Sequence, residues 1–178
     1  MPALSGYSIR HDLSKFALTA ARKARRAQLE AGGVTIRWLE PEDQDALLNL
    51  WREYFPYWAT WDDDWLRRFR DKAGHDQWGW RVLLAEADGR LVGFTGPIWP
   101  TTGGEGTFGS PGVIPAYRGR GIASVLLHVA LDYMKSRGTT FTTYGTSAIN
   151  PALFMYLKAG AEVRGAGVDW FRKVLAAA

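Results

Sequence analysis

The stretch Val113–Ala123 constrains this chain more than any other, because it joins the end of an apolar strand, a loop of glycine and arginine, and the start of a helix. Apolar residues recur at helical spacing from Ile122 onward, and an Arg-Gly pair at 137–138 supplies a basic last turn with a C-terminal glycine. A helix that begins on Gly119 and Gly121 exposes its first backbone N–H groups without a Cβ to block a ligand. These unpaired donors and the helix dipole favour an anion, most naturally a phosphate.

The spacing of this loop separates several kinds of phosphate site. A P-loop needs Lys followed by Ser or Thr after the second glycine, and none is present. The dinucleotide fingerprint nearly fits at Gly119 and Gly121, but its third glycine position is Ser124. The pattern that fits is Arg-x-x-Gly-x-Ala at Arg118, Gly121 and Ala123, directly after Val-x-Pro. It resembles the coenzyme A loop of the GNAT acyltransferase superfamily; the alternative is an ordinary glycine-rich loop that opens a surface helix.

A second motif follows about thirty residues later. The segment 150–160 reads Asn-Pro-Ala-Leu-Phe-Met-Tyr-Leu-Lys-Ala-Gly, with an N-cap and a first-turn proline, and is similar to the helix in the same superfamily that ends in Tyr and then Gly. The elements predicted around both motifs alternate as β-α-α-β-β-β-α-β-α-β-β. The predicted strands cover 34–38, 80–85, 91–98, 107–114, 139–146, and 163–174 around a turn that contains Gly165, with a hairpin turn at Asp88-Gly89.

On these two motifs and this order the chain is identified as a member of the GNAT superfamily. The resemblance implies an α/β fold with a mixed central sheet of six to seven strands, helices on both faces and a splayed central strand pair. Pro111-Gly112 suits a distortion of the central strand, because proline cannot donate to a strand ladder.

The resemblance also implies a reaction and a set of residues. Acetyl-CoA would bind as a co-substrate, without a metal, and a primary amine would attack it directly in a ternary complex. The oxyanion would be stabilised by a backbone N–H near Gly112–Ile114. The residues expected to bind the cofactor are Val113, Ile114, Arg118, Gly119, Arg120, Gly121, Ile122, Ala123, Ser124 and Asn150.

Tyr156 is the expected general acid that protonates the departing thiolate. The alternative is a tyrosine packed in the core with Leu153 and Leu157. Many relatives carry a Glu on the central strand as the base, but residues 107–112 contain no carboxylate. No residue is assigned as the base: Glu105, Asp62–Asp64, His75 and a chain of waters all stay open.

Composition excludes several classes of protein and of active site. The 178 residues include no Cys, which excludes a disulfide scaffold, a Cys-ligated zinc site and a cysteine nucleophile. No apolar run has the length of a membrane span, and no signal peptide opens the chain, so we expect a cytoplasmic protein. The net charge of +4 comes from residues 1–33, and the rest is neutral.

The domains predicted are a basic helical N-terminal arm over 1–33 and an acetyltransferase domain over 34–178. We expect a helix at 12–31 that lies on the domain with its basic residues in solvent. Its other side carries Leu13, Phe16, Ala17, Ala20, Ala24 and Ala27. The arm could instead bind nucleic acid or a membrane surface, or be the remnant of an upstream domain. No aromatic residues interleave its charges for base stacking, so neither nucleic acid nor a membrane is an expected partner.

The expected partner is an amine, either a small molecule or a peptide. The aromatic run 54–61 and the aspartates 62–64 could line its pocket, or could pack and cap a helix. A homodimer is left open. The rival function is an acyl-CoA sensor or interaction domain of the same fold that does not catalyse transfer.

Overall fold

The structure is a computed structural model that describes residues 6–55, 81–147 and 150–167. The strands are β1 (Gly6–Asp12), β2 (Val34–Trp38), β3 (Arg81–Ala87), β4 (Arg90–Trp99), β5 (Glu105–Phe108), β6 (Gly112–Val113), β7 (Phe141–Thr146) and β8 (Ala161–Gly167). The helices are α1 (Ala20–Ala31), α2 (Gln44–Tyr54), α5 (Ile122–Ser136) and α6 (Ala152–Lys158), with short 3-10 turns η1 (Pro41–Asp43) and η3 (Pro115–Tyr117).

All eight of these strands belong to one mixed sheet, in the order β2-β3-β4-β5-β7-β1-β8 with β6 also paired to β4. Neighbours are antiparallel except β5 and β7, which run parallel. The mixed α/β fold predicted from the sequence is confirmed, but the predicted six to seven strands are too few. The described residues contain an additional strand at the N-terminus, and the predicted central strand is divided in two.

The division of the central strand creates the expected distortion. β5 pairs with β4 at Ile98 and Trp99, whereas β6 pairs with β4 at Gly93 and Phe94. Between them Gly109 exchanges backbone hydrogen bonds with the 96–97 segment, its N–H donating to the Pro97 carbonyl over 2.9 Å. Pro111 lies in this break, which agrees with its inability to donate to a ladder.

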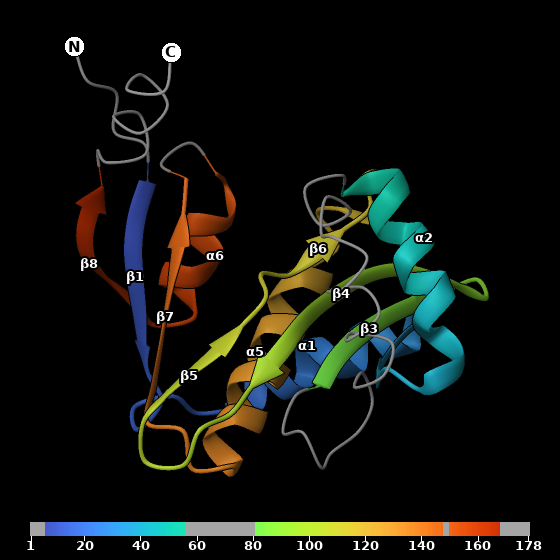
Figure 1. Cartoon of the computed structure of the whole chain (residues 1–178). Coiled ribbons are helices and arrows are strands. Elements are labelled where there is room, and N and C mark those ends of the chain that lie inside the picture. The colour runs from blue at the N-terminus through green and yellow to red at the C-terminus, as the bar shows by residue number, and fades with distance from the viewer. Residues whose placement is uncertain (1–5, 56–80, 148–149, 168–178) are drawn as a thin grey trace, which may run out of the picture.

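The two central strands also separate from each other. β7 pairs with β5 only at Phe141 and Thr142, and the rest of β7 turns away from β6 (Figure 1). The splayed central pair is therefore confirmed. Because an open strand edge leaves backbone N–H and C=O groups unpaired, this separation supplies hydrogen-bonding groups to whatever enters the gap.

Helices cover both faces of the sheet. α5 lies on one face with α1 beside it, and α2 lies on the other (Figure 1). The buried residues of α5 are Ile122, Val125, Leu126, Leu127, Ala130, Leu131 and Met134. On the opposite face Trp51 of α2 packs edge-on against Phe94 of β4, with ring centroids 5.5 Å apart. The predicted hairpin is also present, since Asp88 and Gly89 both adopt the positive φ of a tight β3–β4 turn.

The N-terminal residues do not form the separate helical arm that we expected. β1 lies inside the sheet, antiparallel to both β7 and β8. Ile9 and His11 on β1 are buried, at 0% and 1% exposure. The alternation of Ile9, Arg10 and His11 is too short to reveal a strand, and its partners lie at the other end of the chain. The expected boundary at residue 33 therefore does not separate a distinct N-terminal unit.

The predicted helix at 12–31 is wrong in its start, and its predicted packing side is only partly buried. α1 begins only after Thr19, whose hydroxyl accepts a hydrogen bond from the Arg22 N–H. Of the predicted packing residues, Leu13 and Phe16 are buried but precede the helix, whereas Ala24 and Ala27 are exposed. Within α1 the buried residue is Leu29. Arginines attach α1 to the domain instead.

Each attachment of α1 is a hydrogen bond from a guanidinium to a backbone carbonyl of another element. Arg22 donates to the Ala159 carbonyl (3.2 Å), Arg25 to the Arg120 carbonyl (2.6 Å) and Arg26 to the Ile36 carbonyl (3.2 Å).

Two other predictions fall where the structure gives no description. The strand expected over 168–174 and the helix expected after Asp62–Asp64 lie outside the described residues. Among the helices that are described, none combines the length and the apolar character needed to cross a membrane.

Candidate functional site

The loop before α5 has the conformation that an anion site requires. Gly119 and Gly121 adopt φ values of +76° and +85°, in the left-handed region that favours glycine. Gly121 is the N-cap of α5, so the backbone N–H groups of the first turn have no acceptor within the helix. The first turn carries no acidic side chain that could oppose an anion. The predicted residues Ile122, Ala123 and Ser124 are therefore at a helix start, as expected.

The two arginines of this loop are fixed by contacts within the loop itself. Arg118 donates from Nε to the Val113 carbonyl over 2.9 Å. The Arg120 guanidinium lies 4.6 Å from the centroid of the Tyr117 ring. Tyr117 in turn donates its hydroxyl to Asp88 over 2.7 Å, which ties the loop to the β3–β4 turn. The loop is thus held in place by aromatic and backbone contacts before any ligand binds.

The strand before the loop has one backbone N–H directed toward the gap. The Ile114 N–H donates to the Val92 carbonyl of β4 over 3.0 Å, and Val113 stands opposite Gly93. Because consecutive peptide groups of a strand point to opposite sides, the Val113 N–H points away from β4. It therefore faces the side on which β7 diverges. Of the backbone N–H groups of Val113 and Ile114, that of Val113 is therefore the one that faces the gap.

Tyr156 of α6 lies at the break in the central strand. Its side chain is 1% exposed, and its ring packs edge-on against Tyr144 of β7 with centroids 4.7 Å apart. Burial raises the pKa of Tyr156, and the nearby hydroxyl of Ser110 opposes that rise. Ser110 lies between β5 and β6, so α6 brings the phenol to the distorted segment. A phenol whose pKa is raised stays protonated at neutral pH and can act as a proton donor.

A buried histidine, His11, lies beside the Tyr144–Tyr156 pair and was not found from the sequence. His11 of β1 is within hydrogen-bonding distance of the Tyr144 hydroxyl, with 2.8 Å between Nδ1 and the oxygen. Burial lowers the pKa of His11 to about 4, so the ring is neutral at pH 7. A neutral imidazole has one nitrogen without a proton, and this nitrogen can accept a hydrogen bond from the Tyr144 hydroxyl. The sequence carried no signal for this contact beyond the position of His11 in a short alternating segment.

The other predicted residues are placed as follows. Asn150 accepts the Ala152 N–H on its side-chain oxygen over 2.9 Å and so caps α6, as its position before Pro151 predicted. Glu105 opens β5 opposite Phe141, at the end of the central strand that lies farthest from the loop. The residues 56–61 of the aromatic run, Asp62–Asp64 and His75 lie outside the described residues. Phe55 is described, and its ring packs on Phe94 at 5.1 Å.

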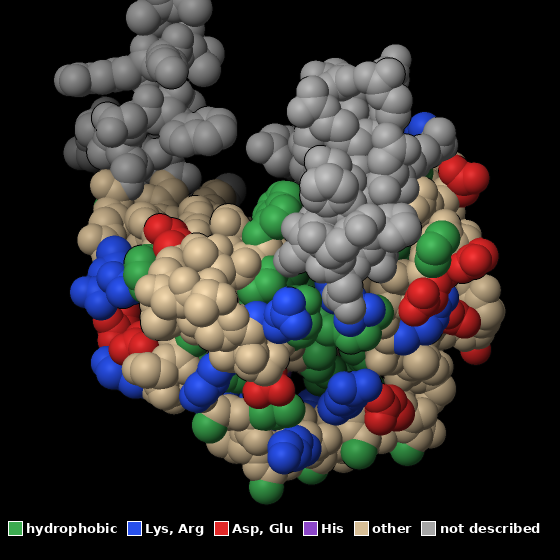
Figure 2. Space-filling model, turned by 60° about the horizontal axis from the view of Figure 1, so that its bottom comes forward, with side chains coloured by type: hydrophobic (Ala, Val, Ile, Leu, Met, Phe, Trp, Pro, Cys, Tyr) green, Lys and Arg blue, Asp and Glu red, His purple; other side chains and the backbone are tan. Residues whose placement is uncertain are grey.

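Charges of both signs share the lower edge of the molecule. Figure 2 brings this edge toward the viewer and shows Lys and Arg side chains interspersed with Asp and Glu, around exposed hydrophobic side chains. The described part of this face has no continuous basic stripe of the kind that nucleic acid needs. Within the same described part of the chain, no group of three or more His, Cys, Asp or Glu residues is arranged to hold a metal ion.

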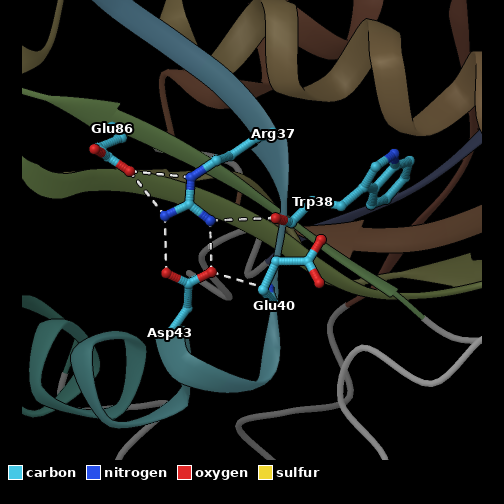
Figure 3. Close-up of polar contacts among 5 residues, drawn as sticks. All are labelled: Arg37, Trp38, Glu40, Asp43 and Glu86. Carbon is cyan, nitrogen blue, oxygen red and sulfur yellow. Dashed lines mark hydrogen bonds and ion pairs between the residues drawn. The ribbon is translucent and has the colours of Figure 1, made fainter.

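A pocket of about 560 Å³ lies between α2 and the β3–β4 turn, away from Tyr156. One wall is an ion-pair cluster in which Arg37 binds Asp43 through both terminal nitrogens and Glu86 through Nε and Nη2 (Figure 3). The guanidinium lowers the pKa of the Asp43 carboxyl, which keeps that partner ionised. These ion pairs connect β2, η1 and β3. Because two carboxylates already bind the Arg37 guanidinium, this wall offers little free positive charge to a ligand.

Comparison with protein families finds a match to the acetyltransferase (GNAT) family over residues 44–161. No curated protein matches the chain. The matched segment contains the loop, α5, the break in the central strand and α6, which are the parts of the structure described above.

Solved structures show the same fold at low identity. A GCN5-related N-acetyltransferase from Sphaerobacter thermophilus aligns with a TM-score of 0.66 and 24% identity, over 92% of this chain and 50% of that chain. A GNAT-family acetyltransferase from Streptococcus pneumoniae aligns with a TM-score of 0.54 and 19% identity, over 71% of this chain and 83% of that chain.

A third similar structure is longer still. The GCN5-related glucosamine N-acetyltransferase region of a fungal multi-domain β-N-acetylglucosaminidase aligns with a TM-score of 0.69 and 17% identity, over 89% of this chain and 19% of that chain. The chain covers between 19% and 61% of the length of three of these similar structures.

Proposed function

The chain belongs to the acetyltransferase (GNAT) family, and from that premise we propose that it transfers an acetyl group from acetyl-CoA to a primary amine. The observation that carries the proposal is the pair of positive-φ glycines at the start of α5, on a loop held by Tyr117, beside a splayed strand pair. Helix N-termini of this kind bind phosphate through backbone N–H groups and the helix dipole.

The proposed cofactor site has two parts. The backbone of Arg118–Ser124 binds the pyrophosphate, with Arg118 and Arg120 as the loop's cations. Val113 and Ile114 on the strand before it lie along the pantetheine arm, and Asn150 shapes the start of α6 at the far side of the gap. The acyl carbonyl then lies near the Val113 N–H, which donates to the oxyanion that forms when the amine adds.

In this mechanism the amine attacks the thioester carbonyl directly, the new C–N bond forms, and the C–S bond breaks. Placing both reactants in one complex supplies most of the rate enhancement, so the enzyme needs no nucleophile. The departing thiolate takes a proton from Tyr156. The amine enters neutral and its nitrogen loses one proton to solvent as the amide forms, and a solvent proton restores the phenol. A free thiol has a pKa near 8.5 and a phenol one near 10, and burial raises that of Tyr156 further, so the phenol is protonated when the thiolate appears.

The test of this role is Tyr156→Phe, which keeps the ring against Tyr144 and removes the proton. We expect kcat to fall by roughly ten- to ten-thousandfold while CoA affinity and thermal stability are retained. Turnover should be measured as thiol release under conditions in which chemistry limits the rate. A variant with wild-type kcat would show that Tyr156 serves packing alone.

The acceptor should be sought with the same assay, across amino acids, peptides, polyamines and aminosugars. The chain has no cysteine, so a thiol reagent reports released CoA without a background from the protein. Glucosamine belongs in the panel because one structurally similar region is described as a glucosamine N-acetyltransferase. Binding of CoA without turnover on any acceptor would favour the rival function, an acyl-CoA sensor of the same fold.

A further inference from the structure

The proposed function does not use the basic residues of α1, and one of them, Arg25, contacts the proposed cofactor loop. Arg25 is exposed, and its Nη2 donates to the Arg120 carbonyl over 2.6 Å. Its Nη1 donates to Gln28 on the same helix over 2.9 Å, which fixes the direction of the guanidinium. Ninety-five residues separate Arg25 from Arg120 in the sequence, so only the fold brings them together.

The guanidinium of Arg25 occupies the space beside Gly121. A Cβ at position 121 would lie 2.8 Å from both Nε and Nη2 of Arg25. By contrast, a Cβ at Gly119 would meet nothing within 4 Å. The absence of a side chain at Gly121 thus lets a cation from another helix lie directly against the N-cap of α5.

This contact changes the electrostatics of the loop. A carbonyl oxygen beside an anion site repels the anion, and Arg25 neutralises that of Arg120 by donating to it. The loop's own arginines are turned to other groups, Arg118 to the Val113 carbonyl and Arg120 to the Tyr117 ring. Arg25 therefore adds a positive charge at the glycine where the helix dipole is strongest.

We propose that Arg25 is a further ligand of the CoA pyrophosphate, supplied to the α5 loop by α1. The inference rests on the proposed function, and it assigns to α1 a part in cofactor binding. Arginine suits this role because its planar group can hold the Arg120 carbonyl with one N–H and bind a phosphate oxygen with others.

The experiment compares wild type, Arg25→Gln and Arg25→Lys by calorimetric titration with CoA and with dephospho-CoA, which lacks only the 3′-phosphate. Lys23→Gln is the matched control, since it removes the same charge from an exposed position on another side of α1. We expect Arg25→Gln to weaken both ligands equally, by about tenfold. Arg25→Lys should recover part of that loss, and Lys23→Gln should bind like wild type. The difference between wild type and Arg25→Gln should shrink as salt is raised, because the interaction is electrostatic and exposed.

Four results would overturn the inference. Unchanged affinity in Arg25→Gln, with wild type binding CoA, would remove Arg25 from the site and leave the proposed function intact. A loss seen with CoA but not with dephospho-CoA would place Arg25 at the 3′-phosphate instead. A loss that is independent of salt and not recovered by Lys would mean that Arg25 only shapes the loop. Failure of wild type itself to bind CoA would remove the proposed function together with the inference.

Discussion

α1 and α5 lie side by side on one face of the sheet, yet they are held there by different interactions. α5 is attached by an apolar stripe of seven buried residues. α1 buries Leu29 alone and is attached by arginines that donate to carbonyls of the loop before α5, the C-terminal end of α6, and β2. Hydrophobic burial is stronger and does not depend on direction, whereas hydrogen bonds fix where a helix lies relative to specific groups. α5 therefore contributes mainly to stability, and α1 links three separate parts of the domain.

The largest expected effect comes from breaking the apolar attachment. Leu127 of α5 is 0% exposed, and Leu127→Ala should lower the free energy of unfolding by about 2–5 kcal/mol, because it removes buried methyl groups and leaves a cavity. Urea denaturation measures the change. Ala27→Ser on the exposed side of α1 is the control and should alter stability by less than about 0.5 kcal/mol. Equal losses in the two variants would contradict the contrast between the helices.

A second test is to lower the pH around two histidines, His11, which is buried, and His128, which is half-buried. Burial lowers the pKa of His11, and that of His128 on α5, to about 4 in each case, and in both cases the charge of Arg22 on α1 adds to the effect. Both pKa values lie below the unfolded value of 6.5, so the unfolded chain binds more protons in this range. Stability should therefore be complete above about pH 6.5 and be lost as the pH falls toward 4.

For His11 the expected loss between pH 7 and pH 5 is about 2 kcal/mol. His128 should contribute in the same direction. Unfolding curves of wild type and His128→Gln across this range measure both contributions. The variant should lose less stability on acidification than wild type, and an identical pH profile would show that His128 is not part of the effect.

The smallest effect is expected from breaking one polar attachment of α1. Arg22 donates to the Ala17 carbonyl (2.7 Å) and the Ala159 carbonyl, and its guanidinium lies 4.8 Å from the centroid of the Phe16 ring. Arg22→Gln should cost about 1 kcal/mol, because these hydrogen bonds replace bonds to water. Lys23→Gln, which removes the same charge from an exposed position, should cost nothing measurable. Hydrogen exchange should quicken in α1 but not in α5, and faster exchange in α5 as well would mean that the helices do not differ in this way.

The sequence predicted those parts of the fold whose signals are local. Four such features depend only on a few neighbouring residues, and all four are present in the structure: the apolar period of α5, the glycines before it, the Asp88-Gly89 turn and the Asn150 cap. The family match adds the fold that these elements imply. The attachment of α1 could not be predicted, because an arginine that donates to a distant carbonyl leaves no period in the sequence.

The same limit applies to the candidate site. The loop and Tyr156 were found from motifs, and they stay predictions in their roles. His11, Tyr144 and Arg25 were not predicted as part of the site, because the contacts that place them there join residues more than ninety positions apart. The direction of the Val113 N–H follows from the register of β6 against β4, and this register could not be predicted from the sequence.

The place of β1 in the sheet has a consequence for how the chain is made. β1 is translated before both of its neighbours, since β7 and β8 begin only at Phe141 and Ala161. Until those residues have left the ribosome, the strand that fills the space between them has no edge to pair with. Pairing over such sequence separations carries a large loop-closure entropy and slows folding. The part of the sheet that contains β1, β7 and β8 can therefore assemble only after β8 has been translated, whereas β2, β3 and β4 can pair before that point.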